Sequence, residues 1–186
     1  IYDLDVPVIV GGCATYQTAL HLMRTGAAGV LVGFGGAATS TNRHVLGIEV
    51  PMATAISDVA EARRDYLDES GGRYVHVIAD GSMGYSGDVV KALACGADAA
   101  MLGTPLARAI EAPGQGWHWG AEAWHEALPR GRRVEVGQVG SLSEVVLGPS
   151  HSPDGTMNIV GALRRALAST GYTEVNAFQR IDLIVR

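Results

Sequence analysis

The chain has 186 residues, 47% of them hydrophobic and 25 of them glycine, and a formal net charge of -5 at pH 7. This length and composition are typical of a globular domain, and the scattered basic residues form no stripe, which argues against nucleic acid as a main partner. The longest apolar runs have the length of strands, so we expect no membrane-spanning segment. Two cysteines in different elements indicate no disulfide framework, and the first residues show no signal-peptide pattern, so the cytoplasm is the simplest expected location.

Apolar runs alternate with helical patterns from the start of the chain, which is typical of βα units on a parallel sheet. We expect four such units. The first has a buried strand at residues 6–10 and a helix that starts at Thr15 and ends at Gly26. The second has a strand at residues 29–32, and a loop over residues 33–51 follows it. A loop of this length at the end of a strand favours a functional role.

The next two units have clearer helix boundaries. Ser57 is a candidate N-cap for a helix that ends at the glycine pair 71–72, and residues 75–79 form the third expected strand. Ser86 is the candidate N-cap of the following helix, and residues 99–102 form the fourth expected strand.

Beyond the fourth strand the regular pattern ends. Residues 111–137 carry all three tryptophans without a clean period. We expect this segment to cross the mouth of the fold, either as a peripheral cover or in contact with a ligand. A helix starts at Asn158, and residues 181–185 are expected to form an edge or closing strand. The pair Arg164 and Arg165 indicates a solvated helix face rather than an anion site.

The most informative stretch covers residues 75–104. Two consecutive strands in it are each followed by polar and glycine residues, which therefore lie at the same end of the sheet. Parallel sheets bind ligands at this end. Asp80 would accept hydrogen bonds from vicinal hydroxyls such as those of a ribose, and the turn after it, together with Gly103 and Thr104, would donate to a phosphate. A nucleoside monophosphate would fit both the ribose site and the phosphate site. The alternative is that Asp80 caps a turn and the glycines only permit tight packing.

Four stretches of the sequence resemble one known family. They are ADGSMGYSGDVVKALACGADAAMLGT (residues 79–104), GFGGAATSTNR (33–43), EAPG (111–114) and GALRRALASTGYTEVNAFQR (161–180). On these motifs the chain resembles the IMP dehydrogenase and GMP reductase family, and within it a divergent bacterial branch that lacks the regulatory CBS pair.

The resemblance implies a (β/α)8 TIM barrel, an α/β fold, of which this chain holds strands five to eight plus a C-terminal extension. Residues 1–186 would then be the C-terminal half of a single catalytic domain. We expect the chain to be a fragment of a longer protein, because an open half barrel exposes two sheet edges. The resemblance also implies a homotetramer, a purine nucleotide (IMP or GMP) as the ligand, NAD as the cofactor and a bound potassium ion.

The family's roles carry over to this chain position by position. The substrate-binding positions are Asp80, Gly81, Ser82, Gly103 and Thr104, the potassium positions are Gly35, Ala37 and Ser40, and the catalytic positions are Ser40 and Thr41. NAD-binding positions remain unassigned. Ser40 replaces the family's catalytic cysteine, and an unactivated hydroxyl is a poor nucleophile at neutral pH, so the usual covalent route is not supported. Ala38 and Asn42 also depart from the family's loop pattern.

Other residues offer alternative chemistry. Cys13 follows the first strand and is expected to point toward the ligand mouth, as a second candidate nucleophile or as a small packing residue. His118 and Glu122 are candidates for an acid or base near the mouth. Cys95 and His76 are expected to be buried packing residues. No spacing of His, Cys and acidic residues indicates a zinc site.

Three functions are consistent with these observations. The first is an NAD-dependent IMP dehydrogenase that oxidises IMP to XMP in guanine nucleotide biosynthesis. The second is a GMP reductase or a related purine nucleotide oxidoreductase. The third is a pseudoenzyme that binds a purine nucleotide without turnover, which the missing cysteine favours.

Overall fold

The computed structural model describes residues 5–36, 38–120 and 131–184. Its centre is a parallel sheet in which four strands follow one another in chain order. The strands are β1 (Ile9–Cys13), β2 (Gly29–Val32), β3 (His76–Ala79) and β4 (Ala99–Ala100). The α/β fold with a parallel sheet that the sequence predicts is therefore confirmed.

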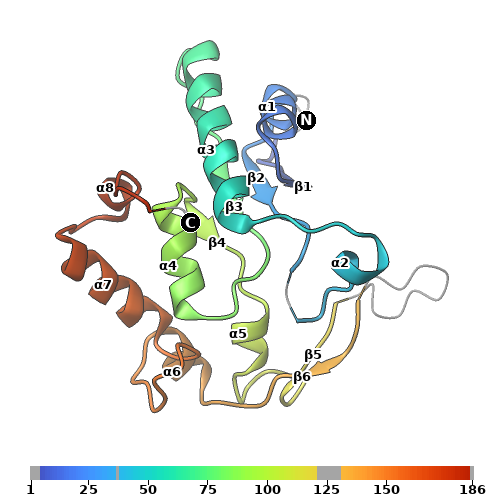
Figure 1. Cartoon of the computed structure of the whole chain (residues 1–186), viewed down its shortest axis with the longest axis vertical. Helices are drawn as coiled ribbons and strands as arrows, with labels where there is room; N and C mark the ends of the chain where they lie inside the picture. Colours follow the sequence, from blue (N-terminus) through green and yellow to red (C-terminus); the bar gives the residue numbers. More distant parts are fainter. Residues whose placement is uncertain (1–4, 37, 121–130, 185–186) are drawn as a thin grey trace.

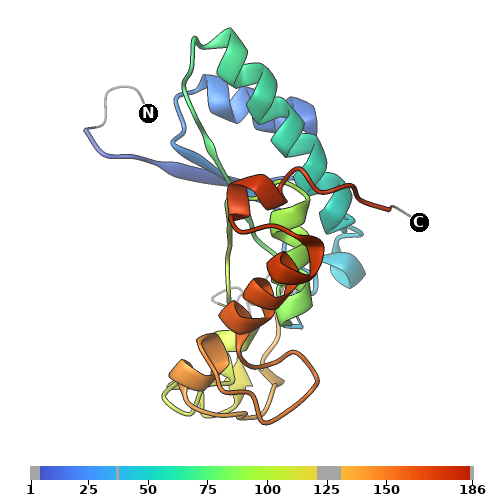
Figure 2. The same ribbon diagram turned by 90° about the vertical axis from the view of Figure 1, so that its left-hand side faces the viewer.

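Three helices between the strands lie on one face of this sheet (Figure 1 and Figure 2). They are α1 (Tyr16–Arg24) after β1, α3 (Met52–Glu69) before β3 and α4 (Ser86–Ala94) between β3 and β4. A short helix, α2 (Asn42–Val45), interrupts the long loop after β2.

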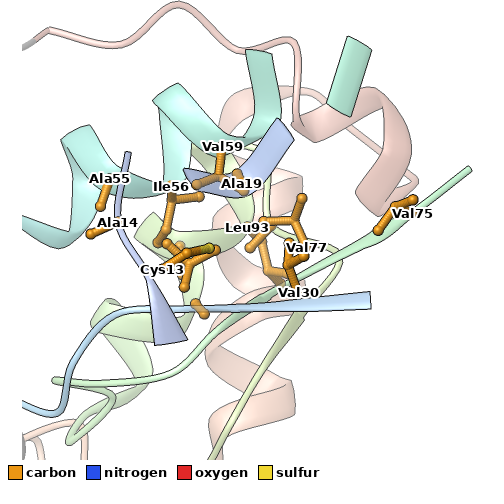
Figure 3. Packing of buried hydrophobic residues seen from close by; sticks show 14 of the residues in the cluster. Cys13, Ala14, Ala19, Val30, Ala55, Ile56, Val59, Val75, Val77 and Leu93 are labelled. Carbon is orange, nitrogen blue, oxygen red and sulfur yellow. The ribbon is translucent and has the colours of Figure 1, made fainter. Parts of the chain in front are cut away.

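The core lies between the sheet and these helices. Val30 pairs with Val77 in one register row, and Val32 pairs with Ala79 two residues further along, so the same face of each strand points at the helices. All four side chains are fully buried. Helix residues that pack against them include Ala19, Ile56, Val59 and Leu93 (Figure 3). Burial of this apolar surface provides the main driving force for the fold.

The opposite face of the sheet has no covering element among the described residues (Figure 2). Its side chains are Ile9, Leu31 and Ile78, which occupy the alternate register positions, and Ile9 is 54% exposed. His76 lies on this face and is exposed, so the prediction that it is a core histidine is wrong. Because the face carries apolar side chains, it has the character of a surface that a further part of a fold covers.

The part of the chain after β4 lies beyond the end of the sheet and beside α4 (Figure 1). It contains α5 (Thr104–Ala107), β5 (Trp117–His118), β6 (Val134–Glu135), α6 (Leu142–Val146), α7 (Ile159–Thr170) and α8 (Val175–Phe178). β5 and β6 form an antiparallel ribbon. Helix α7 runs beside α4, where Leu167 and Phe178 bury Ala94 in a second apolar cluster.

Several element boundaries differ from the sequence predictions. Helix α3 starts at Met52 rather than after Ser57, because Ala55 and Ile56 in its first turns are already buried in the core and Pro51 fits the position before a helix. The N-cap of α4 is Tyr85, and its backbone N–H is bonded by Asp88.

Strand boundaries differ as well. β1 runs over Ile9–Cys13 rather than residues 6–10, and β4 is only two residues long rather than four. The expected closing strand over residues 181–185 does not form in its described part, residues 181–184, where no neighbouring strand is available to pair with it.

The longest described helix is α3, and its 18 residues include Glu61, Arg63, Arg64 and Asp65. No helix in the described part of the chain is both long and apolar enough to span a bilayer.

Candidate functional site

A cavity of about 570 Å³ opens at the carboxyl ends of the strands. Its walls come from the end of β1, from the loops after β2, β3 and β4, and from the ribbon β5–β6. The lining includes Ser40, Asp80, Gly81, Ser82, Gly103, Thr104, Arg108 and His118. The residues that the sequence assigns to substrate binding are thus brought together in one place, at the end of the sheet where parallel α/β proteins bind ligands.

Glycines let the loops after β2 and β3 meet backbone to backbone. A Cβ at Gly81 would collide with the carbonyl oxygen of Gly35, and one at Gly33 would collide with the carbonyl oxygen of Asp80. Both glycines also have positive φ, at +139° and +123°. The Ser82 hydroxyl donates to the Gly36 carbonyl at 3.2 Å. The two loops therefore form one wall of the cavity.

Asp80 follows β3, and its backbone N–H donates to the Val32 carbonyl at 2.7 Å, so the residue is fixed by the sheet. Its carboxylate makes no hydrogen bond or ion pair to any described residue, and partial burial raises its pKa. A partly buried carboxylate without partners is an acceptor that two hydroxyl groups of a ligand would satisfy. A turn-capping role for Asp80 is not observed.

Gly103 and Thr104 come after β4, and they line the same cavity as Asp80. The Thr104 hydroxyl lies 3.1 Å from Nδ1 of His118, which belongs to the ribbon strand β5. Gly103 lies beneath the same imidazole, because a Cβ there would be 3.2 Å from Cε1 of His118. The ribbon thus closes this end of the cavity with a titratable side chain.

Ser40 lies at the other end of the cavity. Its hydroxyl accepts the Asn42 backbone N–H at 3.3 Å, and its backbone pairs with Gly131 in an antiparallel bridge. Arg132 adds two bonds to the same loop, from its backbone N–H to the Thr39 carbonyl at 2.8 Å and from Nε to the Ala38 carbonyl at 3.0 Å. Residues 131 and 132, in the later part of the Trp-rich segment, therefore contact the loop of Ser40.

No described histidine, lysine or carboxylate is hydrogen-bonded to the Ser40 hydroxyl. A serine needs such a base to become a nucleophile. Thr41 precedes α2 without capping it through its side chain. The Oδ1 of Asn42 is buried without a hydrogen-bond partner, while its Nδ2 donates to the Phe34 carbonyl at 2.7 Å. A donor on a ligand or a water would satisfy this Oδ1.

The potassium positions Gly35, Ala37 and Ser40 stay a prediction. Ala37 lies outside the described residues, the Gly35 carbonyl faces Gly81, and the Ser40 hydroxyl is bonded to Asn42. The described residues also contain no group of three or more His, Cys, Asp or Glu side chains arranged to hold a metal.

Cys13 does not point into the cavity, so the expectation that it faces the mouth is wrong. Its side chain is fully buried on the helix side of the sheet, where its thiol lies 3.5 Å from the Leu31 carbonyl. Burial raises its pKa to about 11, so the thiol stays protonated and unreactive. Cys13 is therefore a small packing residue of the core, which is the second of the two roles that the sequence suggests. Cys95 is partly buried against the same core, as expected.

The Trp-rich segment serves as a cover in its described part. Trp117 and Trp119 each contact the guanidinium of Arg133, with 5.0 Å and 4.8 Å between the guanidinium carbon and the ring centroids. Only His118 between them lines the cavity. Glu122, Trp124 and His125 lie outside the described residues.

Sequence reasoning missed Arg108. This residue lines the cavity, donates from Nη1 to the Gly84 carbonyl at 3.0 Å and lies 5.4 Å from the ring centroid of Tyr85. Its spacing of four residues from Thr104 is the signal that points to it, because residues four apart share one face of a helix.

The fold and cavity define a parallel α/β protein that presents an unpaired acid, glycine turns and a cation at the carboxyl end of its sheet. A model of the IMP dehydrogenase / GMP reductase domain matches residues 2–131, so the chain belongs to that family. An uncharacterized oxidoreductase of Mycobacterium leprae is 58% identical over 188 residues, covering the whole chain and 50% of that protein. An inosine-5'-monophosphate dehydrogenase of Thermoplasma acidophilum is 38% identical and covers 96% of the chain.

A solved structure agrees with this assignment. The IMP dehydrogenase/GMP reductase-like protein of Corynebacterium glutamicum is 58% identical and superposes with a TM-score of 0.93 over the whole chain, which covers 49% of that protein. The chain spans about half the length of the mycobacterial relatives that it matches.

Proposed function

We propose that this chain is the C-terminal half of a (β/α)8 barrel and that it holds the nucleotide site of a purine nucleotide oxidoreductase of the IMP dehydrogenase type. The observation that carries the proposal is the cavity in which the free carboxylate of Asp80 lies between the loops of Ser40 and Thr104. By the complete protein we mean this chain joined to the first half of that barrel.

The sheet supports the half-barrel proposal. Its four strands are parallel and in chain order, as consecutive strands of a (β/α)8 barrel are. Both edges are open in the described residues, and the apolar side chains Ile9, Leu31 and Ile78 lie on the face that would become the barrel interior. The relatives that are about twice as long have room for the other four strands.

Each cavity residue has a role in binding IMP or GMP. Asp80 accepts the two ribose hydroxyls, because its carboxylate has no competing partner among the described residues. The backbone N–H groups after Asp80 and at Gly103, with the Thr104 hydroxyl, donate to the phosphate. The base then lies toward Ser40 and Asn42, where the buried Oδ1 of Asn42 needs a donor.

We propose NAD as the oxidant, as in the IMP dehydrogenases of the family. The cavity beside Ser40, on the side of Arg43 and Arg132, has a volume of about 180 Å³, which is too small for a dinucleotide. This cavity alone therefore does not fit NAD, and we derive no step through it. Its binding residues are expected in the first half of the barrel.

The reaction proposed is IMP plus NAD and water to XMP plus NADH and a proton, with the homotetramer of the family as the assembly. One observation favours a second candidate, a pseudoenzyme that binds the nucleotide without turnover: the Ser40 hydroxyl has no base beside it. A GMP reductase would use the same nucleotide-binding residues.

The test is an assay of the complete protein for NADH formation with IMP plus NAD and for NADPH consumption with GMP, beside the variant Ser40→Ala. A dehydrogenase in which Ser40 attacks the base loses activity by about 1,000-fold or more in that variant. Equal rates in both proteins would move the nucleophile elsewhere. No turnover of either nucleotide, with IMP still raising the melting temperature, would select the pseudoenzyme.

The role of Asp80 has its own test. Asp80→Asn should weaken IMP binding by about 10-fold or more, since a bond to a charged acceptor is lost. It should leave the affinity for an IMP analogue without the two ribose hydroxyls unchanged. Asp68→Asn, at an exposed position near the end of α3, is the control. An equal loss with both ligands would contradict the assignment of Asp80 to the ribose.

A further inference from the structure

Arg108 is a cation built into the wall of the cavity. It ends the short helix α5 and is partly buried. Its Nη1 donates to the Gly84 carbonyl at 3.0 Å, and its guanidinium carbon lies 5.4 Å from the centroid of the Tyr85 ring. These two contacts come from the loop between β3 and α4, so the side chain bridges the loops on either side of the cavity and is held in one direction.

The position of Arg108 in α5 brings it beside Thr104. The two residues are four apart in a helical turn, which places them on the same face. Long side chains in a helical turn lean toward its N-terminal end. The guanidinium contacts Gly84 and Tyr85, and Arg108, Gly103 and Thr104 all line the same cavity.

The one acid in the described part of the chain whose pKa the charge of Arg108 clearly influences is Asp154, whose pKa is lowered first by its hydrogen bonds with Thr156 and also by Arg108. Among the described residues no carboxylate forms an ion pair with Arg108. Asp88, an acid of α4 that lines the cavity, accepts the Tyr85 N–H at 3.1 Å and pairs with Lys91 at 3.2 Å. A guanidinium has five N–H donors, and the Gly84 carbonyl takes one of them. The remaining donors are available to a ligand.

We propose that Arg108 is the specificity-determining residue that selects a nucleoside monophosphate over the corresponding nucleoside, by pairing with the phosphate group held at Gly103 and Thr104. This inference rests on the proposed function, since it assigns a further residue to the same nucleotide site. A guanidinium suits this task because its planar fork binds two oxygens of a phosphate at once, which a lysine ammonium does not do.

The experiment compares the affinities of the complete protein for IMP and for inosine by calorimetric titration. The variants are Arg108→Gln and Arg108→Lys, and the control is Arg164→Gln, on the exposed face of α7. Gln keeps an N–H donor of the same kind, but it is shorter and lacks both the charge and the guanidinium fork. We expect Arg108→Gln to weaken IMP binding by about 10- to 100-fold, the value of a charge-assisted hydrogen bond, with Lys intermediate. Inosine affinity and the control should not change.

Salt provides a second readout. Raising the ionic strength should weaken IMP binding to the wild-type protein more than to Arg108→Gln, since the charge pair is screened only where it exists. IMP affinity that is unchanged in Arg108→Gln, or an equal loss for IMP and inosine, would overturn the role of Arg108 and leave the proposed function in place. A wild-type protein that binds neither compound would overturn the proposed function itself. The melting temperature of each variant verifies that it is folded.

Discussion

The hydroxyl of Thr104 lies 3.1 Å from Nδ1 of His118, and this contact ties the end of the sheet to the ribbon β5–β6. It exists because Gly103 has no side chain, which leaves room for the imidazole. Burial lowers the pKa of His118 from its ordinary value. The neutral imidazole offers one donor and one acceptor, so its tautomer decides whether the Thr104 hydroxyl donates to His118 or is free to donate into the cavity.

The contact predicts a pH dependence of stability. Because the pKa of His118 is lower in the folded protein than in the unfolded chain, the unfolded chain binds more protons at mildly acidic pH. The stability contributed by the neutral imidazole is complete above the unfolded value of about 6.5 and is lost as the pH falls below it. His118→Asn, which keeps a polar partner for Thr104, should flatten the decrease of melting temperature between about pH 7 and pH 5.

His21→Asn, on the exposed face of α1, is the control for this measurement, because it removes a histidine outside the cavity. A melting temperature that falls with acid as steeply in His118→Asn as in the wild-type protein would show that other groups cause the decrease.

Gly81 is predicted to be intolerant of any side chain. A Cβ there meets the Gly35 carbonyl, and the φ of +139° is one that other residues rarely adopt. Gly81→Ala should therefore lower the unfolding free energy by about 2 kcal/mol or more and separate the two loops of the cavity wall. Gly71→Ala provides a matched control, since Gly71 also has a positive φ, +70°, but nothing lies within 4 Å of its Cβ position.

Urea denaturation of both glycine variants, followed by IMP binding, measures this difference. The control should lose about 1 kcal/mol from backbone strain alone and keep its ligand affinity. Equal losses in the two variants would mean that the close approach of Gly35 to Gly81 contributes nothing beyond the φ angle.

The sequence predicts the parallel sheet because apolar runs such as those at Gly29–Val32 and His76–Ala79 are short, β-branched and separated by helical patterns. It also predicts the strand ends correctly enough to place Asp80 and Thr104 in one cavity. The start of α3 is missed because Met52 and Ala53 become helical through tertiary packing of the residues after them, which local propensity does not contain.

Residues on the ribbon and on α5 are harder to predict. His118 lies in the β5–β6 ribbon, a pairing of two two-residue strands in which Trp117 pairs with Glu135 and His118 pairs with Val134. Such a pairing leaves no local period in the sequence. The direction of Cys13 was predicted wrongly because β1 extends to Cys13, and the pairing of Cys13 with Val32 after a register shift turns its side chain toward the helices.

The buried thiol of Cys13 is predicted to be inert. Its pKa is raised to about 11 by burial, and its side chain has no exposed surface. At pH 8 the folded protein should therefore show no rapid labelling of Cys13 by a thiol reagent, and labelling should appear on unfolding. Cys13→Ala should lower the unfolding free energy by about 1 kcal/mol, as a small core truncation does, and leave nucleotide turnover unchanged. Rapid labelling of Cys13 in the folded protein, accompanied by loss of turnover, would restore it as a nucleophile.

The ion pair of Arg63 and Asp98 is predicted to be the most sensitive charged contact of the described chain. The Nη1 of Arg63 lies 2.7 Å from Oδ2 of Asp98, and both side chains are largely buried. Asp98 also accepts bonds from the Tyr74 hydroxyl at 2.6 Å and from the Val77 backbone N–H at 2.8 Å, so it joins α3 to β3. Removing one partner leaves the other charge buried without compensation.

Arg63→Ala should therefore lower the unfolding free energy by about 3 kcal/mol or more. Arg64→Ala, at the next and exposed position of α3, should change it by less than about 0.5 kcal/mol. Asp98→Asn should be milder than Arg63→Ala, because the amide oxygen still accepts from Tyr74 or Val77 while the charge is lost. Chemical denaturation of the three variants measures these values. If Arg63→Ala is as stable as Arg64→Ala, the buried pair is not what joins the helix to the sheet.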